Sequence, residues 1–214
     1  MAHILLTGAG GGIGSSIKKA LEAQGHTVTG IDRSDADLTS RSGIEALAEK
    51  LVTEGTIFDW IVFSHGFIDA ETDLAKQSLE SMEHTLMLNT LSPIGITGKL
   101  LPTLPAGGGV VFISSTAGIS PNGRYSTYSA SKAALNAFSQ ALARAYPDKV
   151  FIALAPGPTD TAMREKIGGD RAKAQDPQAI ADFIARLVAG RTEYRSGDIV
   201  VVRDGKDTLH ARLD

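Results

Sequence analysis

The sequence predicts an α/β protein in which a single, doubly wound parallel sheet lies between two layers of helices, giving three layers in all. Two observations lead to this prediction. Short apolar runs rich in Val and Ile alternate along the 214 residues with segments of helical periodicity, as in repeated βαβ units. A glycine-rich turn, residues 7–14, follows the first apolar run and opens a helix. No repeat, low-complexity tract or linker divides the chain, so we expect one domain over residues 1–214.

Strands are expected where β-branched and aliphatic residues cluster between turn residues. Six segments meet this description: 3–7, 27–32, 58–64, 108–114, 149–155 and 198–203. Helices are expected where apolar residues recur every three to four positions. They cover the segment from Ile13 to the C-cap glycine Gly25, then 42–54, 76–101 and 126–146, with a kink at Pro93 in the third helix.

Composition excludes several classes of function. Hydrophobic residues make up 43% and charged residues 21% of the chain, which is ordinary for a soluble globular protein. The net charge of −3 gives no basic surplus for nucleic acid or anionic lipid, and the absence of cysteine excludes disulfides and thiolate metal sites. The first residues lack a secretory leader, and no apolar run approaches the ~18 residues of a membrane span. We therefore expect a cytoplasmic protein without a metal site.

The glycine-rich turn predicts a phosphate-binding site. Gly8, Gly12 and Gly14, with Ile13 between the last two, let the backbone approach a dinucleotide pyrophosphate at a helix N-terminus. The alternative is a tight loop without a ligand.

The second predicted strand ends at Asp32 and Arg33. Asp32 lies 18 residues after Gly14, about where a carboxylate accepts hydrogen bonds from the adenosine ribose, and it would repel the 2′-phosphate of NADP. Arg33 could instead bind that phosphate, and Asp32 could be a turn-forming residue. NAD is therefore the expected cofactor, with NADP as the alternative.

Tyr128 and Lys132 are four residues apart, which places a phenol and an ammonium on one face of a helix. A phenol beside a fixed cation can act as an acid or base. The pair could also lie on an ordinary surface helix, because this spacing is common. Ser115, at the end of an apolar run 13 residues before Tyr128, favours the chemical interpretation.

The order of these motifs resembles the short-chain dehydrogenase/reductase family. The match comprises the glycine turn of residues 7–14, Asn89, Ser115, the Tyr-Ser-Ala-Ser-Lys stretch 128–132 and the Pro-Gly segment 156–161. It runs in order over nearly the whole chain, which resembles compact NAD-dependent hydroxysteroid dehydrogenase-like members. The resemblance implies a Rossmann fold with the cofactor across the carboxyl ends of the strands.

The resemblance also implies roles for individual side chains. Tyr128 would be the general acid/base, and Lys132 would lower the phenol's pKa and hold the nicotinamide ribose. Ser115 would hold the substrate oxygen, and Asn89 would organise a water that connects Lys132 to solvent. A helix-capping serine and a locally satisfied buried asparagine are the structural alternatives.

Further cofactor contacts follow from the same resemblance. Pro156, Gly157, Thr159 and Thr161 would lie near the nicotinamide. Asp37 and Leu38 would lie beside the adenine, although Asp37 could instead cap the next helix. The family's Asn-Asn-Ala-Gly is replaced here by Ser64, His65 and Gly66, which would border the adenosine through their backbone. A metal-binding role for His65 is not expected, because no other ligands lie near it in sequence.

Two segments depart from the family pattern. Almost no chain separates Asp32 from Asp37, so we expect a shortened sheet edge with only a short extended piece at 36–38. The segment 162–176 is short and polar, which predicts a mobile or incomplete substrate lid. Substrate contacts are expected from Phe67, Ile68, 117–124 and 163–167, and helices 76–101 and 126–146 would form a homodimer or homotetramer.

The sequence thus predicts an NAD-dependent oxidoreductase that acts on a small secondary alcohol or ketone. Two alternatives remain open: an NADPH-dependent carbonyl reductase and a non-catalytic dinucleotide-binding sensor.

Overall fold

The computed structural model describes residues 1–121 and 123–213, and these contain one seven-stranded sheet in the order β2-β1-β3-β4-β5-β6-β7. The first six strands pair in parallel and the last is antiparallel to β6. Their bounds are β1 (His3–Thr7), β2 (Thr27–Ile31), β3 (Trp60–Phe63), β4 (Gly109–Ile113), β5 (Val150–Pro156), β6 (Ile199–Arg203) and β7 (Lys206–Ala211).

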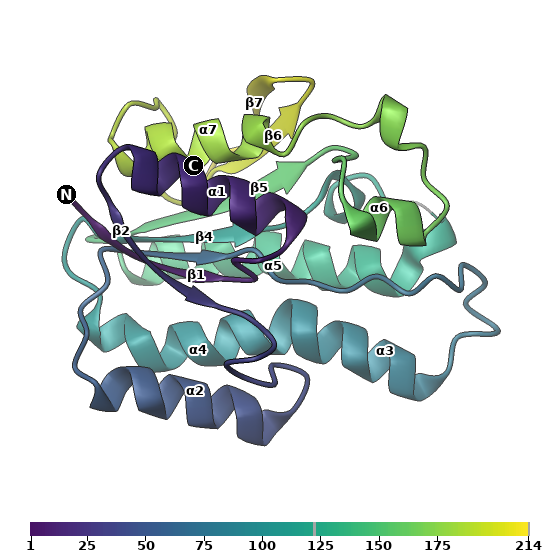
Figure 1. Cartoon of the computed structure of the whole chain (residues 1–214), viewed down its shortest axis with the longest axis horizontal. Coiled ribbons are helices and arrows are strands. Elements are labelled where there is room, and N and C mark those ends of the chain that lie inside the picture. The colour runs from purple at the N-terminus through teal and green to yellow at the C-terminus, as the bar shows by residue number, and fades with distance from the viewer. Residues whose placement is uncertain (122, 214) are drawn as a thin grey trace.

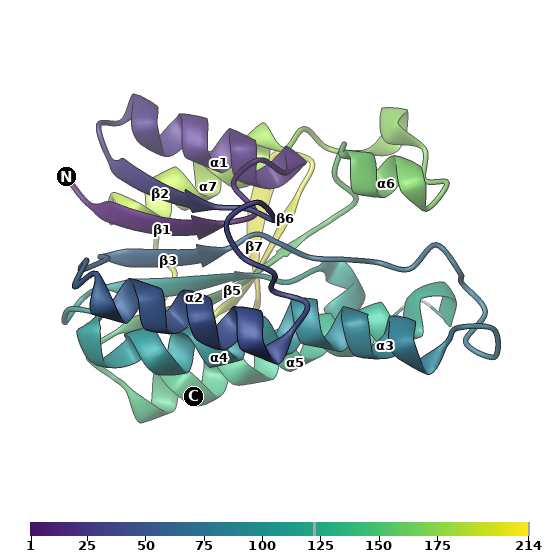
Figure 2. The ribbon, with the colours of Figure 1, turned by 60° about the horizontal axis from the view of Figure 1, so that its bottom comes forward.

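Helices cover both faces of the sheet (Figures 1 and 2), which confirms the predicted three-layer, doubly wound architecture. One face carries α1 (Gly12–Ala23) and α7 (Gln178–Val188), which pack against each other. The opposite face carries α2 (Arg41–Thr53), α3 (Leu79–Leu86), α4 (Ser92–Leu100) and α5 (Ser126–Ala145).

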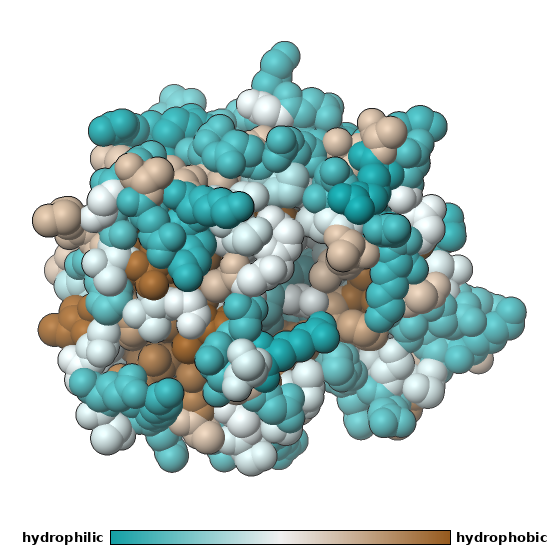
Figure 3. Space-filling view, in the orientation of Figure 1, coloured by the Kyte–Doolittle hydropathy of each residue, from teal (hydrophilic) through white to brown (hydrophobic). Residues whose placement is uncertain are grey.

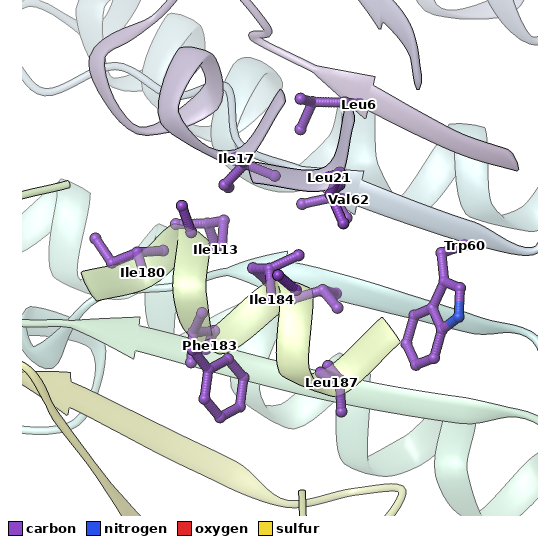
Figure 4. Close-up of a cluster of buried hydrophobic side chains, with 14 of the residues drawn as sticks. Leu6, Ile17, Leu21, Trp60, Val62, Ile113, Ile180, Phe183, Ile184 and Leu187 are labelled. Atoms are coloured by element: carbon purple, nitrogen blue, oxygen red, sulfur yellow. The ribbon is translucent and has the colours of Figure 1, made fainter. Parts of the chain in front are cut away.

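The alternation of side chains along the strands divides the core into two clusters. On β3, Trp60 and Val62 belong to the cluster under α1 and α7, whereas Ile61 and Phe63 belong to the cluster on the other face. Figure 4 shows the first cluster, in which α1 and α7 point aliphatic side chains at the strands. Each such buried side chain contributes roughly 1.5–3 kcal/mol relative to an exposed one.

The predicted helix 76–101 is interrupted before Pro93. A π-helical turn (Met87–Leu91) separates α3 from α4, and Pro93 lies in the first turn of α4. Proline is tolerated in a first helical turn, where its missing N–H is least needed. Asn89 lies within the π-helical turn, so the irregularity coincides with a predicted site residue.

The sequence predicts a shortened sheet edge after the second strand, with an extended piece at 36–38. β2 is an edge strand, which confirms the shortened edge, but residues 36–38 form no strand. The other edge departs from the parallel arrangement, because β7 runs antiparallel to β6. Asp204 and Gly205 both have positive φ, 52° and 73°, and such a pair suits a two-residue hairpin turn, which reverses the chain into β7.

His65 braces the centre of the fold, in the segment where the family has asparagines. Its Nδ1 is 2.6 Å from the Thr7 hydroxyl, and its Nε2 is 3.0 Å from the Leu88 carbonyl and 2.7 Å from the Ser92 hydroxyl. A carbonyl can only accept, so Nε2 carries the proton and Nδ1 accepts from Thr7. Neutral imidazole thus joins the end of β1 to the π-helical turn and α4.

The environment of His65 keeps it neutral. Burial, reinforced by the positive charge of Lys132, lowers the pKa of His65 to about 3. In the unfolded chain the imidazole titrates near the ordinary value of about 6.5.

This difference predicts a pH dependence of stability. Between about pH 6.5 and pH 4 the unfolded state binds a proton at His65 that the folded state does not. The free energy of unfolding therefore decreases as the pH is lowered, by up to about 1.4 kcal/mol per pH unit. The His65→Gln variant should lose this contribution. Urea unfolding of both proteins between about pH 7 and pH 4 measures it, with His210→Gln, an exposed histidine, as control. Equal slopes for wild type and His65→Gln would contradict the bracing role.

Candidate active site

The predicted chemical residues converge at the carboxyl ends of the parallel strands, as this fold requires of a ligand site. Ser115 follows β4, while Tyr128 and Lys132 lie in the first two turns of α5. All three line a cavity of about 330 Å³. The space-filling view shows the molecular face hollowed near its centre, with hydrophilic, intermediate and hydrophobic residues around the hollow (Figure 3).

Lys132 is a buried cation fixed by the strand beneath it. Its side chain is 4% exposed, and its Nζ donates to the Ile113 carbonyl at 2.8 Å. Ser114 Oγ donates to the Lys132 carbonyl at 3.0 Å and so fixes α5 against the end of β4. Burial lowers the pKa of Lys132 to about 8, because the ammonium loses most of its hydration.

Tyr128 lies between this cation and Ser115. The Lys132 Nζ is 5.8 Å from the centroid of the phenol ring, and the Tyr128 phenol interacts with the Ser115 side chain. Burial raises the pKa of Tyr128, and the interaction with Ser115 opposes that rise. This differs from the lowering expected from Lys132: in the chain itself, the loss of hydration has the larger effect on the pKa of the phenol.

Asn89 uses its side chain to hold the backbone of the neighbouring loop. Its Oδ1 accepts from the Phe67 N–H at 2.7 Å, and its Nδ2 donates to the Phe67 carbonyl at 2.8 Å and to Ser131 Oγ at 3.0 Å. The locally satisfied asparagine, one of the two alternatives from the sequence, therefore describes this side chain. Its part in a water path to Lys132 stays a prediction.

Ser115 combines the two interpretations that the sequence left open. Its Oγ accepts from the Ala117 N–H at 3.1 Å and caps a short 3₁₀ helix (Thr116–Gly118). The same side chain faces the cavity and contacts Tyr128. Capping therefore fixes the serine in a position where it can also bind an oxygen.

The glycine turn borders a second, larger cavity of about 930 Å³, and its glycines leave no room for side chains. A Cβ at Gly8 would lie 2.8 Å from the backbone nitrogen of His65, and one at Gly12 would lie 2.7 Å from Thr161 Cγ2. A Cβ at Gly14 would lie 2.0 Å from the Gly8 carbonyl oxygen. This cradle of close backbone at the start of α1 fits a dinucleotide pyrophosphate.

The far end of this larger cavity holds the predicted adenosine contacts. Asp32 Oδ2 accepts from the Gly10 N–H at 2.8 Å, and Arg33 lines the same cavity from an exposed position. Leu38 is buried there, 7% exposed. Asp37 does not cap α2: its carboxylate accepts from Thr39, which lowers the pKa of Asp37, and the cap is Ser40.

The segment after β5 joins the two cavities. Pro156, Gly157 and Thr159 line the smaller cavity, and Thr161 lines both. Thr161 caps α6 (Ala162–Lys166) by accepting from the Arg164 N–H at 3.3 Å. Residues common to both cavities make them continuous: Ile13, Ser64, His65, Gly66, Thr161 and Met163.

The substrate contacts predicted from sequence are only partly brought together. Ile68, Met163 and Ile167 line the smaller cavity, whereas Phe67 lines the larger one, with the Lys166 ammonium 5.1 Å above its ring. Of the range 117–124, Ala117 and Ser120 line the smaller cavity, and Asn122 lies outside the described residues.

Sequence reasoning missed Tyr125 and Arg203, which also line the smaller cavity. Tyr125 immediately precedes α5 and was within reach of the motif at 128–132. Arg203 ends β6 and reaches Gly157 only through strand pairing, so no local pattern could indicate it.

Within 1–121 and 123–213, no group of three or more His, Asp or Glu side chains is arranged to hold a metal ion. None of the helices in these ranges is both long enough and apolar enough to span a membrane.

Several known proteins are similar to this chain in sequence and fold. The short chain dehydrogenase family model matches residues 33–172. A benzil reductase ((S)-benzoin forming) of Saccharomyces cerevisiae is 32% identical over 77% of this chain and 74% of its own. An NADPH-dependent pterin aldehyde reductase of Arabidopsis thaliana is 26% identical over 93% of this chain and 92% of its own.

A crystal structure of a short chain dehydrogenase from Shigella flexneri superposes with a TM-score of 0.83 at 24% identity, covering 94% of this chain and 89% of that one. The glycine cradle, the converging Ser115, Tyr128 and Lys132 and these matches lead to one conclusion. The chain belongs to the short-chain dehydrogenase/reductase family and is an NAD(P)-dependent oxidoreductase that acts on CH–OH or carbonyl groups.

Proposed function

We propose that this protein transfers hydride between NAD(H) and a small secondary alcohol or ketone, with Tyr128 as the acid/base. The observation that carries the proposal is the contact of Tyr128 with Ser115 beside the buried Lys132, in a cavity continuous with the glycine cradle. A non-catalytic sensor would need the cradle alone, and it gives no reason for this cluster of three side chains.

We propose a task for each of these side chains in the reduction of a ketone. Bound NADH supplies the hydride. The Tyr128 hydroxyl gives its proton to the substrate oxygen, and Ser115 holds that oxygen by a hydrogen bond. The Lys132 ammonium stabilises the phenolate that remains, and the Ile113 carbonyl keeps the ammonium in place.

The residues after Thr161 are proposed to act as the substrate lid. The segment 162–176 contains α6 and a 3₁₀ turn (Arg171–Lys173), and Arg171 pairs with Asp160 and Glu165. Met163 reaches both cavities from this segment. The lid is therefore short but internally bonded.

The Tyr128→Phe variant tests the mechanism. Removing the hydroxyl should lower kcat by at least about 100-fold, because general acid/base catalysis contributes about 10²–10⁴. The dissociation constant for NADH should change little. Turnover in a panel of ketones and NADH titration measure the two effects, with the exposed Tyr146→Phe as control. Near-normal turnover in Tyr128→Phe would refute the assignment, and cofactor binding without turnover of any ketone by the wild type would favour the sensor.

NAD is the proposed cofactor because Asp32 carries its carboxylate into the larger cavity near the predicted ribose position. A carboxylate there repels the additional phosphate of NADP. The NADPH-dependent alternative rests on Arg33 in the same cavity and on the relative that is named as NADPH-dependent.

Removal of the Asp32 charge tests which of the two cofactors the protein prefers. Wild type should bind NADH more tightly than NADPH, and Asp32→Asn should improve NADPH binding about tenfold, which corresponds to about 1.4 kcal/mol. Asp73→Asn removes the same charge at an exposed position outside the cavity and should leave the ratio unchanged. Tighter binding of NADPH by the wild type would contradict the role of Asp32.

A homodimer or homotetramer is proposed through the long helices. In α3 and the π-helical turn that follows it, Leu79, Leu86 and Leu91 remain 71%, 39% and 47% exposed. The cytoplasm is the proposed location, in keeping with the absence of cysteine. Light scattering should give a mass above the 22.4 kDa of one chain, and Leu86→Lys with Leu91→Lys should reduce it to one chain. A monomeric wild type would refute this assembly.

A further inference from the structure

The smaller cavity has more positive charge than the proposed reaction requires. Among its described lining residues, three are cationic, namely Lys132, Arg164 and Arg203, and none is Asp or Glu. The chain as a whole is acidic, with a net charge of −3. Positive charge is thus concentrated in the cavity that holds Ser115 and Tyr128.

Arg164 enters the cavity from α6 without a partner in the described chain. Its Nε is buried and makes no hydrogen bond, although a buried polar nitrogen normally has one. Gly169 packs directly on the Arg164 side chain, since a Cβ at that glycine would lie within 2.6 Å of Arg164 Cδ, Nε and Cζ. The lid backbone therefore holds the guanidinium close, but offers it no acceptor.

The acids near Arg164 are already paired with other cations. Asp160 and Glu165 both bond Arg171, and Asp170 bonds Lys173. This distribution leaves Arg164 as a lid cation whose charge is not neutralised by the described residues.

Arg203 is an exposed cation at the end of β6 that also lines the cavity. Its Nε would lie 3.2 Å from a Cβ at Gly157, so its side chain crosses the end of β5. The nearby Asp207 is bonded by Arg186 and by the Tyr194 hydroxyl. No ion pair of Arg203 is found in the residues described.

From these observations we propose that the substrate carries a carboxylate, which Arg164 and Arg203 bind while its ketone or alcohol group faces Ser115 and Tyr128. This inference rests on the oxidoreductase function proposed above and adds the substrate class. A guanidinium presents paired N–H donors that match the two oxygens of a carboxylate. Positive potential in a partly enclosed, largely apolar cavity also concentrates anions.

The remaining walls and the size of the cavity limit the substrate further. Ile68, Pro158 and Ile167 provide apolar surface between the polar groups. A volume of about 330 Å³ lies at the lower end of the range for ligand pockets. The substrate is therefore a small oxo acid or hydroxy acid with an apolar middle. Reduction adds a hydride to the carbonyl carbon and the Tyr128 proton to its oxygen, and the carboxylate is unchanged.

Matched acids and esters test the proposal. We would measure kcat/KM for 2-, 4- and 5-oxohexanoate and for their methyl esters, with NADH and with NADPH. For at least one pair, wild type should prefer the acid by at least about tenfold, as expected for a charge-assisted hydrogen bond. Arg164→Gln and Arg203→Gln should each lower kcat/KM for that acid about tenfold through KM, and should leave the ester nearly unchanged.

A control variant separates charge from lid stability. Ala172→Gly loosens the 3₁₀ turn of the lid without changing its charge and does not line the cavity, so it should affect acid and ester equally. A binding measurement removes the dependence on turnover: Tyr128→Phe with bound NADH should bind the acid, by calorimetry, at least about tenfold more tightly than the ester. Inorganic phosphate should inhibit only weakly, because it lacks the apolar part.

The outcomes distinguish the two proposals. Equal turnover of acids and esters by the wild type, or a preference for every ester, would overturn the carboxylate proposal and leave the oxidoreductase function intact. Weaker NADH binding by Arg164→Gln with an unchanged acid-to-ester ratio would assign the guanidinium to the cofactor and also overturn it. Preferred binding of the acid without turnover of any pair would support the carboxylate site and refute the proposed reaction.

Discussion

Parallel pairing of β1, β3, β4 and β5 is the constraint on which the active site depends. The register places Thr7 beside Phe63, Phe63 beside Phe112 and Phe112 beside Ala153. Because each strand is hydrogen-bonded to the next, the segments that leave their carboxyl ends must begin side by side. Four segments far apart in the sequence therefore meet there: the glycine turn after β1, the residues around His65 after β3, Ser115 after β4 and the Pro-Gly segment at the end of β5. The two cavities occupy this meeting place.

A buried positive charge sets the electrostatics of that edge. Lys132 loses hydration and keeps one strong acceptor, the Ile113 carbonyl. The same charge contributes to keeping His65 neutral, and only the neutral ring can both donate to Leu88 and accept from Thr7. The protonation states of the site and the bracing of the fold are therefore coupled through one ammonium group. The phenol of Tyr128, which is itself poorly hydrated, remains protonated beside it.

The lid shows how ion pairing can direct charge as well as stabilise a segment. Exposed ion pairs such as those of Arg171 contribute little to stability, about 0–1 kcal/mol. Their position has a greater effect, because they occupy the acids that would otherwise neutralise Arg164. The hairpin turn at Asp204 and Gly205 has a similar effect: it brings Asp207 to Arg186 and Tyr194 and leaves Arg203 directed at Gly157.

The sequence by itself determined the three layers, the parallel strands and the motifs that follow them, including Ser115, Tyr128 and Lys132. It could do so because periodicity and glycine turns are local properties of a few residues. It could not supply β7, the π-helical turn around Asn89, the cap at Ser40 or the bracing by His65. The tertiary structure alone also decided that Arg203 reaches the cavity and that the phenol's pKa rises with burial. The physical reason is that burial and the pairing of charges depend on residues far apart in the chain, which only the packed layers bring together.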